Sequence, residues 1–261
     1  MSNDEDYTGD VQTFWNSRAG LGQWAGTRDV IAKHLEIEAI ATYVRDGMRI
    51  LEVGCGNGIT AIELARRYQV DVIGVDFAQE MITAATGLAS RQDLKGSVRF
   101  QISDIRDPLS FTDKFDLVYS ERVLINLPDW PSQRQAILSI RDVLCDGGCY
   151  VMCENSQDGL DQINLLRTRV GLTSIAAPWH NHYLVDADIE QASFPGLSLE
   201  EINFYSSTYY FLSRVVNAWL ALQDGKEPDY NAPVNGLALQ LPSIGKIGQG
   251  RIWLWRRSGQ G

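Results

Sequence analysis

The sequence is poor in the residues that build metal centres and disulfide frameworks. Its 261 residues contain four cysteines and three histidines. The cysteines include no Cys-x-x-Cys pair, so the zinc-binding loops that such pairs form are not expected. We therefore expect reduced thiols that pack as small apolar side chains, and no metal ion at the functional site.

Long apolar runs and basic clusters are missing as well. No apolar stretch approaches the ~20 residues of a membrane-spanning helix, and the acidic N-terminus is unlike a signal peptide. The formal net charge is −10, and no segment is rich in Lys and Arg. Nucleic acid is therefore not expected as a partner, because its binding depends on cations that neutralise phosphates. These features favour a cytoplasmic protein with a small-molecule partner, without membrane or nucleic-acid partners.

What the sequence does contain is a glycine-rich turn between an apolar run and a helical pattern. Residues 50–53 are apolar except for Glu52, and glycines follow at 54, 56 and 58. Residues 59–67 then place apolar side chains at helical spacing. This order predicts the first strand, turn and helix of a doubly wound sheet. A ligand would lie against the turn, with an anionic group at the helix N-terminus.

The spacing of the glycines indicates the ligand. A dinucleotide fingerprint, Gly-x-Gly-x-x-Gly, would need glycine where Ile59 stands, and the Tyr-x-x-x-Lys of short-chain oxidoreductases is missing too. Residues 52–58, Glu-Val-Gly-Cys-Gly-Asn-Gly, resemble instead the first motif of class I S-adenosylmethionine-dependent methyltransferases. In that family the turn holds the methionine end of the cofactor. The resemblance implies cofactor contacts for Glu52, Gly54, Cys55, Gly56, Asn57 and Gly58.

An acid follows the second predicted strand, residues 70–75. Asp76 lies 76 − 58 = 18 residues after the last glycine, close to the ~20 expected for a carboxylate that binds a ribose diol. The alternative is a cap for the helix predicted over residues 78–89. We favour ribose binding, with Phe77 and Met81 beside the adenine; the family's second motif also ends a strand with an acid.

A third predicted strand, residues 98–102, leads to Asp104 and Ile105. In the family an acid at this point receives the adenine amino group, and the next residue packs on the ring. The resemblance implies these two roles for Asp104 and Ile105. The alternative is an ordinary turn aspartate.

The fourth predicted strand, residues 115–119, leads to Ser120 and Glu121. Ligands bind beyond the carboxyl ends of strands in such sheets, so residues 120–122 are expected to face the reaction centre, with Ser120 as a cofactor-binding candidate. A helix over residues 131–144, a Gly-Gly turn and a fifth strand over residues 149–154 follow. The glycine turn, the acids after the second and third strands, the fourth strand and the Gly-Gly turn follow one another in the order found in the family. This shared order makes the resemblance more specific than the glycine turn alone.

The complete pattern predicts an α/β fold with a doubly wound, mostly parallel, seven-stranded sheet and helices on both faces. By resemblance, the final strand runs antiparallel between the fifth and sixth. Residues 1–46 are expected to form a helical lid segment, and residues 47–261 the cofactor-binding domain. The remaining expected elements are helices at 29–46, 186–191 and 209–222, a strand at 198–204, a surface loop at 224–243 and an edge strand at 252–255.

The segment before the core supplies two cofactor-binding candidates, Trp15 and Arg18. In the family this region often folds over the cofactor, and an aromatic face here could meet the positive sulfonium through a cation–π contact. The alternative is that its aromatic residues pack the segment onto the core. Residues 11–26 look too irregular for one long helix, and residues 1–10 are expected to fray.

Residues 155–184 depart from the minimal family pattern and are expected to be an insertion, with a helix at 160–170, that covers the substrate. This insertion contains His180 and His182, which suit a general base because histidine titrates near neutrality. Glu121 and Glu154 are rival bases. Two alternatives stay open: the histidines could bond to the backbone, or form a metal site with a carboxylate.

The resulting hypothesis is a methyltransferase that moves a methyl group from S-adenosyl-L-methionine to a small molecule and leaves S-adenosyl-L-homocysteine. The acceptor is expected to be a hydroxyl of a sugar or secondary metabolite, methylated by in-line displacement with general-base assistance. A nitrogen or carbon acceptor and a non-catalytic regulator or scaffold are the alternatives. A homodimer interface is suggested by the aromatic residues Tyr205, Tyr209, Tyr210, Phe211 and Trp219.

Overall fold

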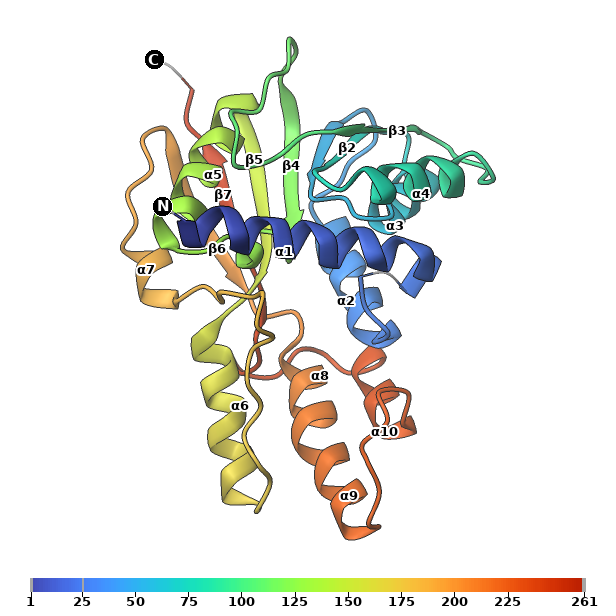
Figure 1. The fold of residues 1–261 in the computed structure, drawn as a ribbon, viewed down its shortest axis with the longest axis vertical. Helices are drawn as coiled ribbons and strands as arrows, with labels where there is room; N and C mark the ends of the chain where they lie inside the picture. Colours follow the sequence, from blue (N-terminus) through green and yellow to red (C-terminus); the bar gives the residue numbers. More distant parts are fainter. Residues whose placement is uncertain (1, 25, 260–261) are drawn as a thin grey trace.

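A single seven-stranded sheet forms the centre of the protein, in the order β3-β2-β1-β4-β5-β7-β6 (Figure 1). The structure is a computed structural model that describes residues 2–24 and 26–259, without the side chains of residues 2–6, 8 and 22–24. Neighbouring strands from β3 to β5 pair in parallel, whereas β7 runs antiparallel to both β5 and β6. The predicted fold class is confirmed. The strands are Arg49–Val53 (β1), Asp71–Asp76 (β2), Ser97–Ile102 (β3), Phe115–Glu121 (β4), Leu144–Asn155 (β5), Leu197–Asn203 (β6) and Gly250–Arg257 (β7).

The last strand is not at an edge of the sheet. β7 lies between β5 and β6, as the family resemblance implied, so the expectation of an edge strand at 252–255 is wrong. Trp253 and Trp255 are both almost completely buried, and so are Ile252 and Leu254, which point to the other face. An uninterrupted apolar run of this kind is typical of a strand covered on both faces.

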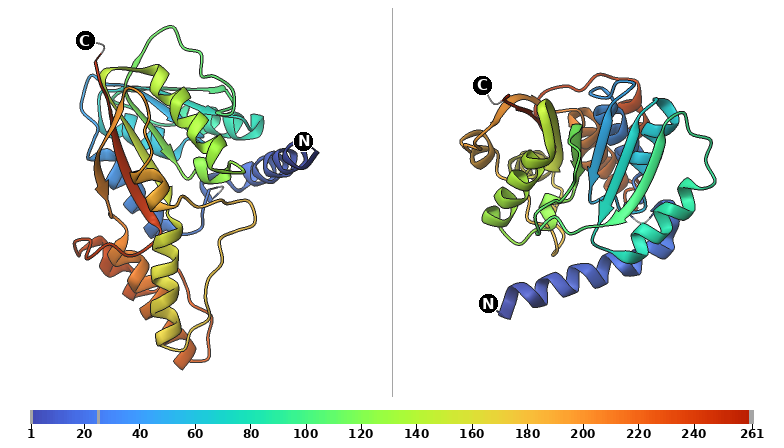
Figure 2. Two further views of the ribbon diagram at one scale, coloured as in Figure 1. Left: turned by 90° about the vertical axis from the view of Figure 1, so that its left-hand side faces the viewer. Right: turned by 90° about the horizontal axis from the view of Figure 1, so that it is seen from above.

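Helices cover both faces of the sheet (Figure 2). Strand side chains alternate between the faces, so Leu51 and Val53 enter one apolar cluster and Ile50 enters the other. The first cluster packs against α5 (Trp130–Val143) and α7 (Asp186–Glu190), and the second against α2 (Val30–Ala41) and α3 (Ile59–Arg67). α4 (Gln79–Ala89) follows β2. All four cysteines are free thiols, and Cys55, Cys149 and Cys153 are buried.

The N-terminal segment forms one long helix, α1 (Ser2–Arg18), followed by the 3₁₀ turn η1 (Ala19–Trp24). Residues 2–10 are helical where fraying was expected. Residues 11–24 are divided between the end of α1 and η1, so they do not form one long helix, as the irregular pattern indicated. Tertiary contacts hold α1: Tyr7 Oη donates to the His180 carbonyl (2.9 Å), and Trp15 Nε1 donates to Asn126 Oδ1 (3.3 Å). Figure 1 shows α1 crossing in front of the lower end of β4.

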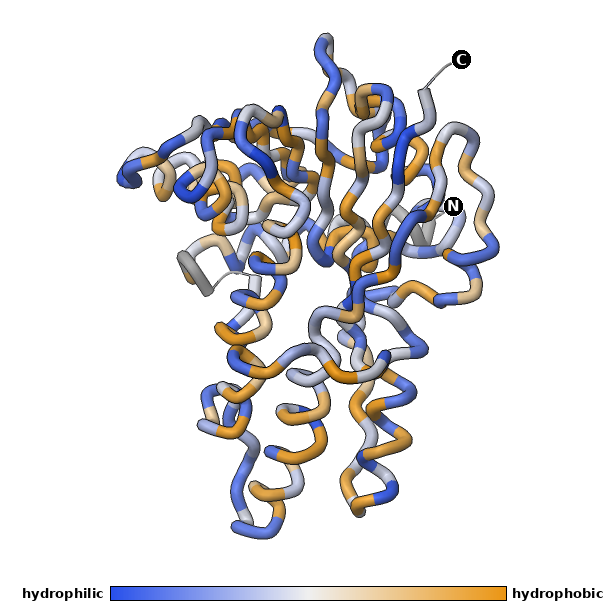
Figure 3. The backbone as a smooth tube through the Cα atoms, turned by 180° about the vertical axis from the view of Figure 1, so that it is seen from behind, coloured by the Kyte–Doolittle hydropathy of each residue, from blue (hydrophilic) through white to orange (hydrophobic). Residues whose placement is uncertain are grey.

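A helical extension projects past the carboxyl ends of the parallel strands (Figures 1 and 3). It contains α6 (Gln157–Arg169), α8 (Ser207–Phe211), the π-helical turn η3 (Leu212–Val216), α9 (Asn217–Gln223), α10 (Pro233–Gly236) and the 3₁₀ turn η4 (Leu237–Leu239). Residues 224–243 are therefore partly helical rather than a plain loop. Asn235 explains this, because its buried amide donates to the carbonyls of Asp229 and Tyr230.

The extension also bears on the predicted dimer. Tyr209 and Tyr210 are buried in a cluster with Ile163 of α6, so they are unavailable for an interface on this surface. Phe211 and Trp219 are exposed. A homodimer therefore stays a prediction. None of the helices in the described part of the chain is long and apolar enough to cross a membrane.

Candidate active site

The glycine turn follows β1 and lies at the carboxyl edge of the sheet. Gly54, Gly56 and Gly58 have φ angles of +67°, +51° and +75°, a region that side chains disfavour. A Cβ on Gly54 would lie 2.3 Å from Val123, and one on Gly58 would lie 2.4 Å from the Phe100 ring. A Cβ on Gly56 would meet nothing within 4 Å. Gly56 therefore leaves open space in which a ligand can touch the backbone.

Asp76 joins the end of β2 to this turn. Its Oδ2 accepts from Gly56 N (2.8 Å), and its Oδ1 accepts from Ala78 N at the start of α4 (2.9 Å). Burial raises the pKa of Asp76, while these N–H groups oppose the rise. The contact with Ala78 resembles the helix cap considered as the alternative. Each oxygen keeps a lone pair for a hydroxyl group, so a buried diol-binding carboxylate fits here.

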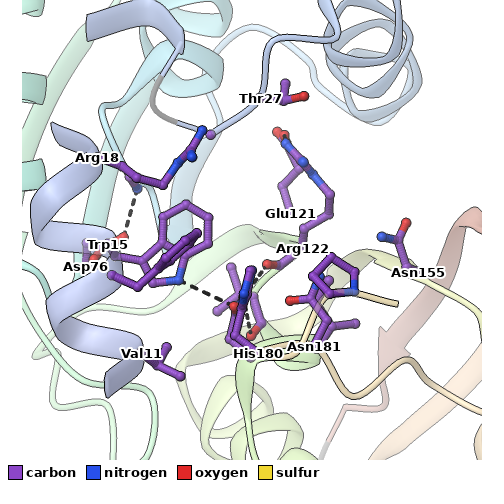
Figure 4. Close-up of a pocket in the computed structure, with 18 of the residues that line it drawn as sticks. Val11, Trp15, Arg18, Thr27, Asp76, Glu121, Arg122, Asn155, His180 and Asn181 are labelled. Carbon is purple, nitrogen blue, oxygen red and sulfur yellow. Dashed lines mark hydrogen bonds and ion pairs between the residues drawn. The ribbon is translucent and has the colours of Figure 1, made fainter. Parts of the chain in front are cut away.

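A cavity of about 470 Å³ opens beside the turn (Figure 4), within the range of about 300–1,000 Å³ typical of small-molecule sites. It brings together most of the residues predicted to hold the cofactor: Trp15, Arg18, Glu52, Gly54, Cys55, Gly56, Asn57, Asp76, Phe77, Met81, Asp104 and Ile105. Gly58 and Ser120 do not line it. Gly58 faces Phe100 and Ala85, and Ser120 is buried with its hydroxyl on Glu154.

Asp104 has a partner that the sequence analysis did not anticipate. Its carboxylate forms an ion pair with Arg106, and both residues line the cavity. Burial raises the pKa of Asp104, but hydrogen bonds from Arg106 outweigh this and leave the pKa below its usual value. A ligand amino group would therefore share this carboxylate with a guanidinium.

The end of α1 forms one wall of the cavity. Trp15 packs on Ala78 and Met81, and the Arg18 guanidinium lies 5.5 Å from the centroid of the Phe14 ring. Burial lowers the pKa of Arg18, and the positive charges of nearby arginines lower it further. The wall thus combines aromatic faces with a cation. This placement agrees with the predicted lid segment, whose contact with cofactor stays a prediction.

The two candidate histidines lie in different surroundings. His180 lines the cavity, and its ring centroid is 4.4 Å from that of Phe14 and 5.2 Å from that of Trp179. Burial lowers the pKa of His180, and Arg18 adds to this effect. His182 does not line the cavity. Its backbone N–H donates to the Ile125 carbonyl (2.6 Å), and its ring centroid lies 5.7 Å from that of Tyr7.

The two candidate glutamates differ as well. Glu154 is buried away from the cavity lining, where its Oε1 accepts from Ser120 Oγ (2.7 Å) and from the N–H groups of Val123 and Leu124 (both 3.1 Å). It therefore supports the turn η2 (Leu124–Asn126). Burial raises its pKa to about 7. The expectation that Glu154 reaches the substrate does not match this placement.

Glu121 does line the cavity, at the end of β4. Its Oε1 lies 2.5 Å from Lys33 Nζ, and its Oε2 accepts from Thr60 Oγ1 (2.7 Å). Burial alone would raise its pKa, but the charges of Lys33 and Arg122 lower the pKa to about 2. Glu121 is thus a fixed negative charge in the wall.

Sequence reasoning missed two charged residues of α2, Lys33 and Glu36, that line the cavity beside Arg122. Arg122 has φ +57°, the only positive φ among the described non-glycine residues, and its Nε lies 3.1 Å from Glu36 Oε1. The sequence does contain a pattern that could have identified Lys33 and Glu36. These two charged residues are spaced by one helical turn in an otherwise apolar stripe.

The opposite side of the cavity belongs to the helical extension. Arg214, in the π-helical turn η3, pairs with Asp29 (3.1 Å), and Tyr209 Oη donates to the same carboxylate (2.5 Å). π-helical turns often occur at functional sites. The other lining residues from this side of the molecule are Asn155, Asn181, Tyr183, Tyr210, Tyr230 and Gln249.

Comparison with known sequences points to one activity. A family model described as a methyltransferase domain matches residues 44–181, just over half of the chain. A 27-O-demethylrifamycin SV methyltransferase from Amycolatopsis mediterranei (strain S699) is 31% identical over 132 residues, 49% of this chain and 46% of that protein. A magnesium-protoporphyrin O-methyltransferase from Rhodobacter capsulatus is 38% identical over 79 residues, 30% of this chain and 34% of that protein. The chain spans about half the length, or less, of these curated relatives.

Comparison with solved structures supports the fold. Magnesium protoporphyrin IX methyltransferase from Synechocystis PCC 6803, solved with bound S-adenosylhomocysteine, aligns with a TM-score of 0.61 at 16% identity. The alignment covers 96% of this chain and 100% of that one. The cyclase SpnF aligns with a TM-score of 0.58 at 22% identity, over 92% of this chain and 84% of that one. At such identities the likeness concerns the fold alone.

Proposed function

We propose that this chain, which belongs to the methyltransferase-domain family of class I S-adenosylmethionine-dependent enzymes, methylates a hydroxyl group of a small molecule. That small molecule would be a sugar or a secondary metabolite. One observation carries the proposal. The glycine turn and Asp76 share a single cavity with polar side chains of the extension, so cofactor and acceptor can meet. O-methyltransferases among the relatives support oxygen as the acceptor atom.

A nitrogen acceptor is the second candidate. Ajmaline N-methyltransferase from Rauvolfia serpentina is 35% identical over 80 residues, 31% of this chain and 28% of that protein. An amine presented in its neutral form needs little help from a base, whereas a hydroxyl loses a proton during the reaction. The two acceptors therefore differ in their demand for a proton-accepting side chain.

When bound, S-adenosylmethionine supplies a methyl group on a positively charged sulfur. The chain's own task is to hold the acceptor oxygen in line with that methyl group, and alignment of this kind contributes roughly 7–11 kcal/mol to catalysis. In this proposal residues 1–46 serve as a lid, with α1 keeping water out, and residues 155–184 cover the acceptor. Asp76 and the turn hold the nucleoside and methionine ends.

The proposal is tested by calorimetry followed by an acceptor screen. We expect S-adenosylhomocysteine to bind the wild-type protein, and Asp76→Ala to weaken this binding at least tenfold, because a hydrogen bond to a charged group is worth about 1.5–3 kcal/mol. A panel of phenols, sugars and amines would then be incubated with S-adenosylmethionine and scored by mass. Lack of cofactor binding would refute the assignment, and binding without methylation of any acceptor would favour a non-catalytic module.

A further inference from the structure

Three carboxylates and two cations lie together in the cavity wall behind the glycine turn. Glu36 of α2, Glu52 of β1 and Glu121 of β4 are all buried and line the cavity. Lys33 Nζ and Arg122 Nη2 lie 2.5 Å and 3.5 Å from Glu121 Oε1. Arg122 Nε lies 3.1 Å from Glu36 Oε1. The cluster thus has one carboxylate more than its cations neutralise.

Glu36 and Glu52 are the members with an oxygen left over. The Oε2 atom of each is buried and has no hydrogen-bond partner among the described residues, a state that is costly for an ionised carboxylate. Both cations of the cluster contact Glu121, and only Arg122 also reaches Glu36. Arg122 contacts Glu36 and Glu121 from a backbone conformation with positive φ. Strained conformations of this kind are most frequent at functional sites. Glu36 is therefore suited to hold an exchangeable proton.

We propose that Glu36 is a further catalytic residue, which accepts the proton of the acceptor's hydroxyl group during methyl transfer. This inference rests on the hydroxyl methylation proposed above. The hydroxyl oxygen uses a lone pair to bond to the methyl carbon, the carbon–sulfur bond breaks with its electron pair remaining on sulfur, and the hydroxyl proton passes to a Glu36 oxygen. Charge balances, because sulfur loses its positive charge as Glu36 becomes neutral.

The surroundings of Glu36 agree with this role. Burial raises its pKa to about 8, the charge of Arg122 opposes the rise, and the charge of Glu121 adds to it. Catalytic bases work best when their pKa lies near the operating pH. The titratable and charged groups that interact with it are Lys33 on its own helix, Glu121 and Arg122 at the end of β4, Cys153 on β5, and Tyr205 and Tyr210 before and within α8.

The other candidates fit less well. Ion pairs hold Glu121 ionised with its pKa at about 2, so its carboxylate is a weak proton acceptor. His180 packs its ring against Phe14 and Trp179. His182 and Glu154 do not line the cavity. Glu36 and Glu52 both line the cavity and have an oxygen without a hydrogen-bond partner among the described residues. Glu52 belongs to the glycine motif that is expected to hold the cofactor, whereas Glu36 lies beside Arg122 at the end of β4.

The proton on Glu36 is measurable without an acceptor. Infrared difference spectra of the protein with S-adenosylhomocysteine would be recorded about two pH units below and above the expected midpoint. We expect the carbonyl band of a protonated carboxyl group to lose a component in Glu36→Gln. The control variant Glu63→Gln, which changes a carboxylate of α3 outside the cavity, is expected to keep that component. An unchanged band in Glu36→Gln would overturn the proposal.

Kinetics test the catalytic step with the best hydroxyl acceptor from the phenol and sugar panel. Glu36→Gln is expected to lower kcat by about 10²–10⁴-fold, to leave S-adenosylhomocysteine affinity within threefold, and to abolish the rise of kcat with pH. Glu36→Asp, which keeps a carboxylate and is expected to fold, should restore part of the rate and its pH dependence. His180→Phe should keep that pH dependence.

The outcomes separate this inference from the proposed function. If the wild type methylates a hydroxyl and Glu36→Gln retains its rate and pH profile, the role of Glu36 is refuted while the function stands. If the wild type binds no cofactor, the proposed function itself fails. Circular dichroism of each variant would show that any loss of rate does not come from unfolding.

Discussion

At the residue scale, the three glycines of the turn have the same sign of φ but different neighbours. Gly54 and Gly58 are packed against Val123 and Phe100, whereas Gly56 faces open space. The sequence shows three equivalent glycines, and the structure divides them into two that are packed against other side chains and one that leaves open space. Their variants should therefore differ in kind.

Gly56→Ala should leave a folded protein that binds cofactor poorly. The positive φ costs roughly 1–2 kcal/mol of folding free energy, and the added methyl group occupies the open space where a ligand would lie. Gly58→Ala is expected to be less stable by a further ~1–3 kcal/mol, because the methyl group overlaps Phe100. Denaturant unfolding and calorimetry with S-adenosylhomocysteine check both. Equal stability of the two variants would contradict this division.

At the scale of elements, α1 is held by contacts at a few points along its length. Tyr7 reaches the His180 carbonyl, Gln12 reaches the Phe77 carbonyl (3.2 Å), and Trp15 reaches Asn126. These contacts link the lid segment to both the cofactor side and the His180 side of the cavity. The periodicity of apolar residues in the sequence would not predict this helix, because the apolar residues of α1 do not recur along one face.

Tyr7→Phe should loosen the segment around His180 while leaving the fold intact. It removes one hydrogen bond, worth about 0.5–1.5 kcal/mol, and keeps the ring contacts of Tyr7 with Trp179 and His182. Hydrogen exchange of the amides in residues 179–183 is expected to quicken relative to wild type. Gln12→Ala is the matched control, because it releases α1 at Phe77 instead. Unchanged exchange in Tyr7→Phe would show that α1 does not order this segment.

At the scale of the whole molecule, buried carboxylates determine how stability depends on pH. Burial raises the pKa of Glu36 and Glu52 to about 8 and that of Glu154 to about 7. In the unfolded chain these groups titrate near 4.3. Between these values the folded state binds more protons than the unfolded state, so stability falls as pH rises. Glu121, with its pKa at about 2, acts in the opposite direction below pH ~4.

We therefore expect the free energy of unfolding to decrease from about pH 5 to about pH 8. Glu52→Gln should flatten this decrease, because the amide does not titrate. Urea unfolding at several pH values measures the slope. Glu63→Gln serves as the control, because Glu63 of α3 is only half-buried and pairs with Arg66. A rise of stability over this pH range would contradict the assignment of raised pKa values.

The sequence also determined little about assembly. The aromatic residues that suggested a dimer divide into buried Tyr209 and Tyr210 and exposed Phe211 and Trp219. Sedimentation of the wild type and of Trp219→Ala would show whether this exposed surface joins two copies. The predicted dimer requires a concentration-dependent mass that falls in the variant.

The sequence by itself determined the order of the seven strands and of the main helices between them, the glycine turn and the acid after β2, but not the short helical turns within residues 224–243. These features depend on local periodicity and on backbone angles that only glycine adopts readily. The place of β7 did not follow from its own residues, which were expected to form an edge strand, and only the family resemblance implied its position between β5 and β6.

Only the tertiary structure decided which polar residues share the cavity. Glu154 and Glu121 both follow the pattern of acids at strand ends, yet one supports η2 and the other pairs with Lys33. Glu36 enters the site because α2 packs its charged turn beside Arg122. Side-chain direction and burial depend on contacts between segments far apart in the chain, and local sequence patterns do not encode these contacts.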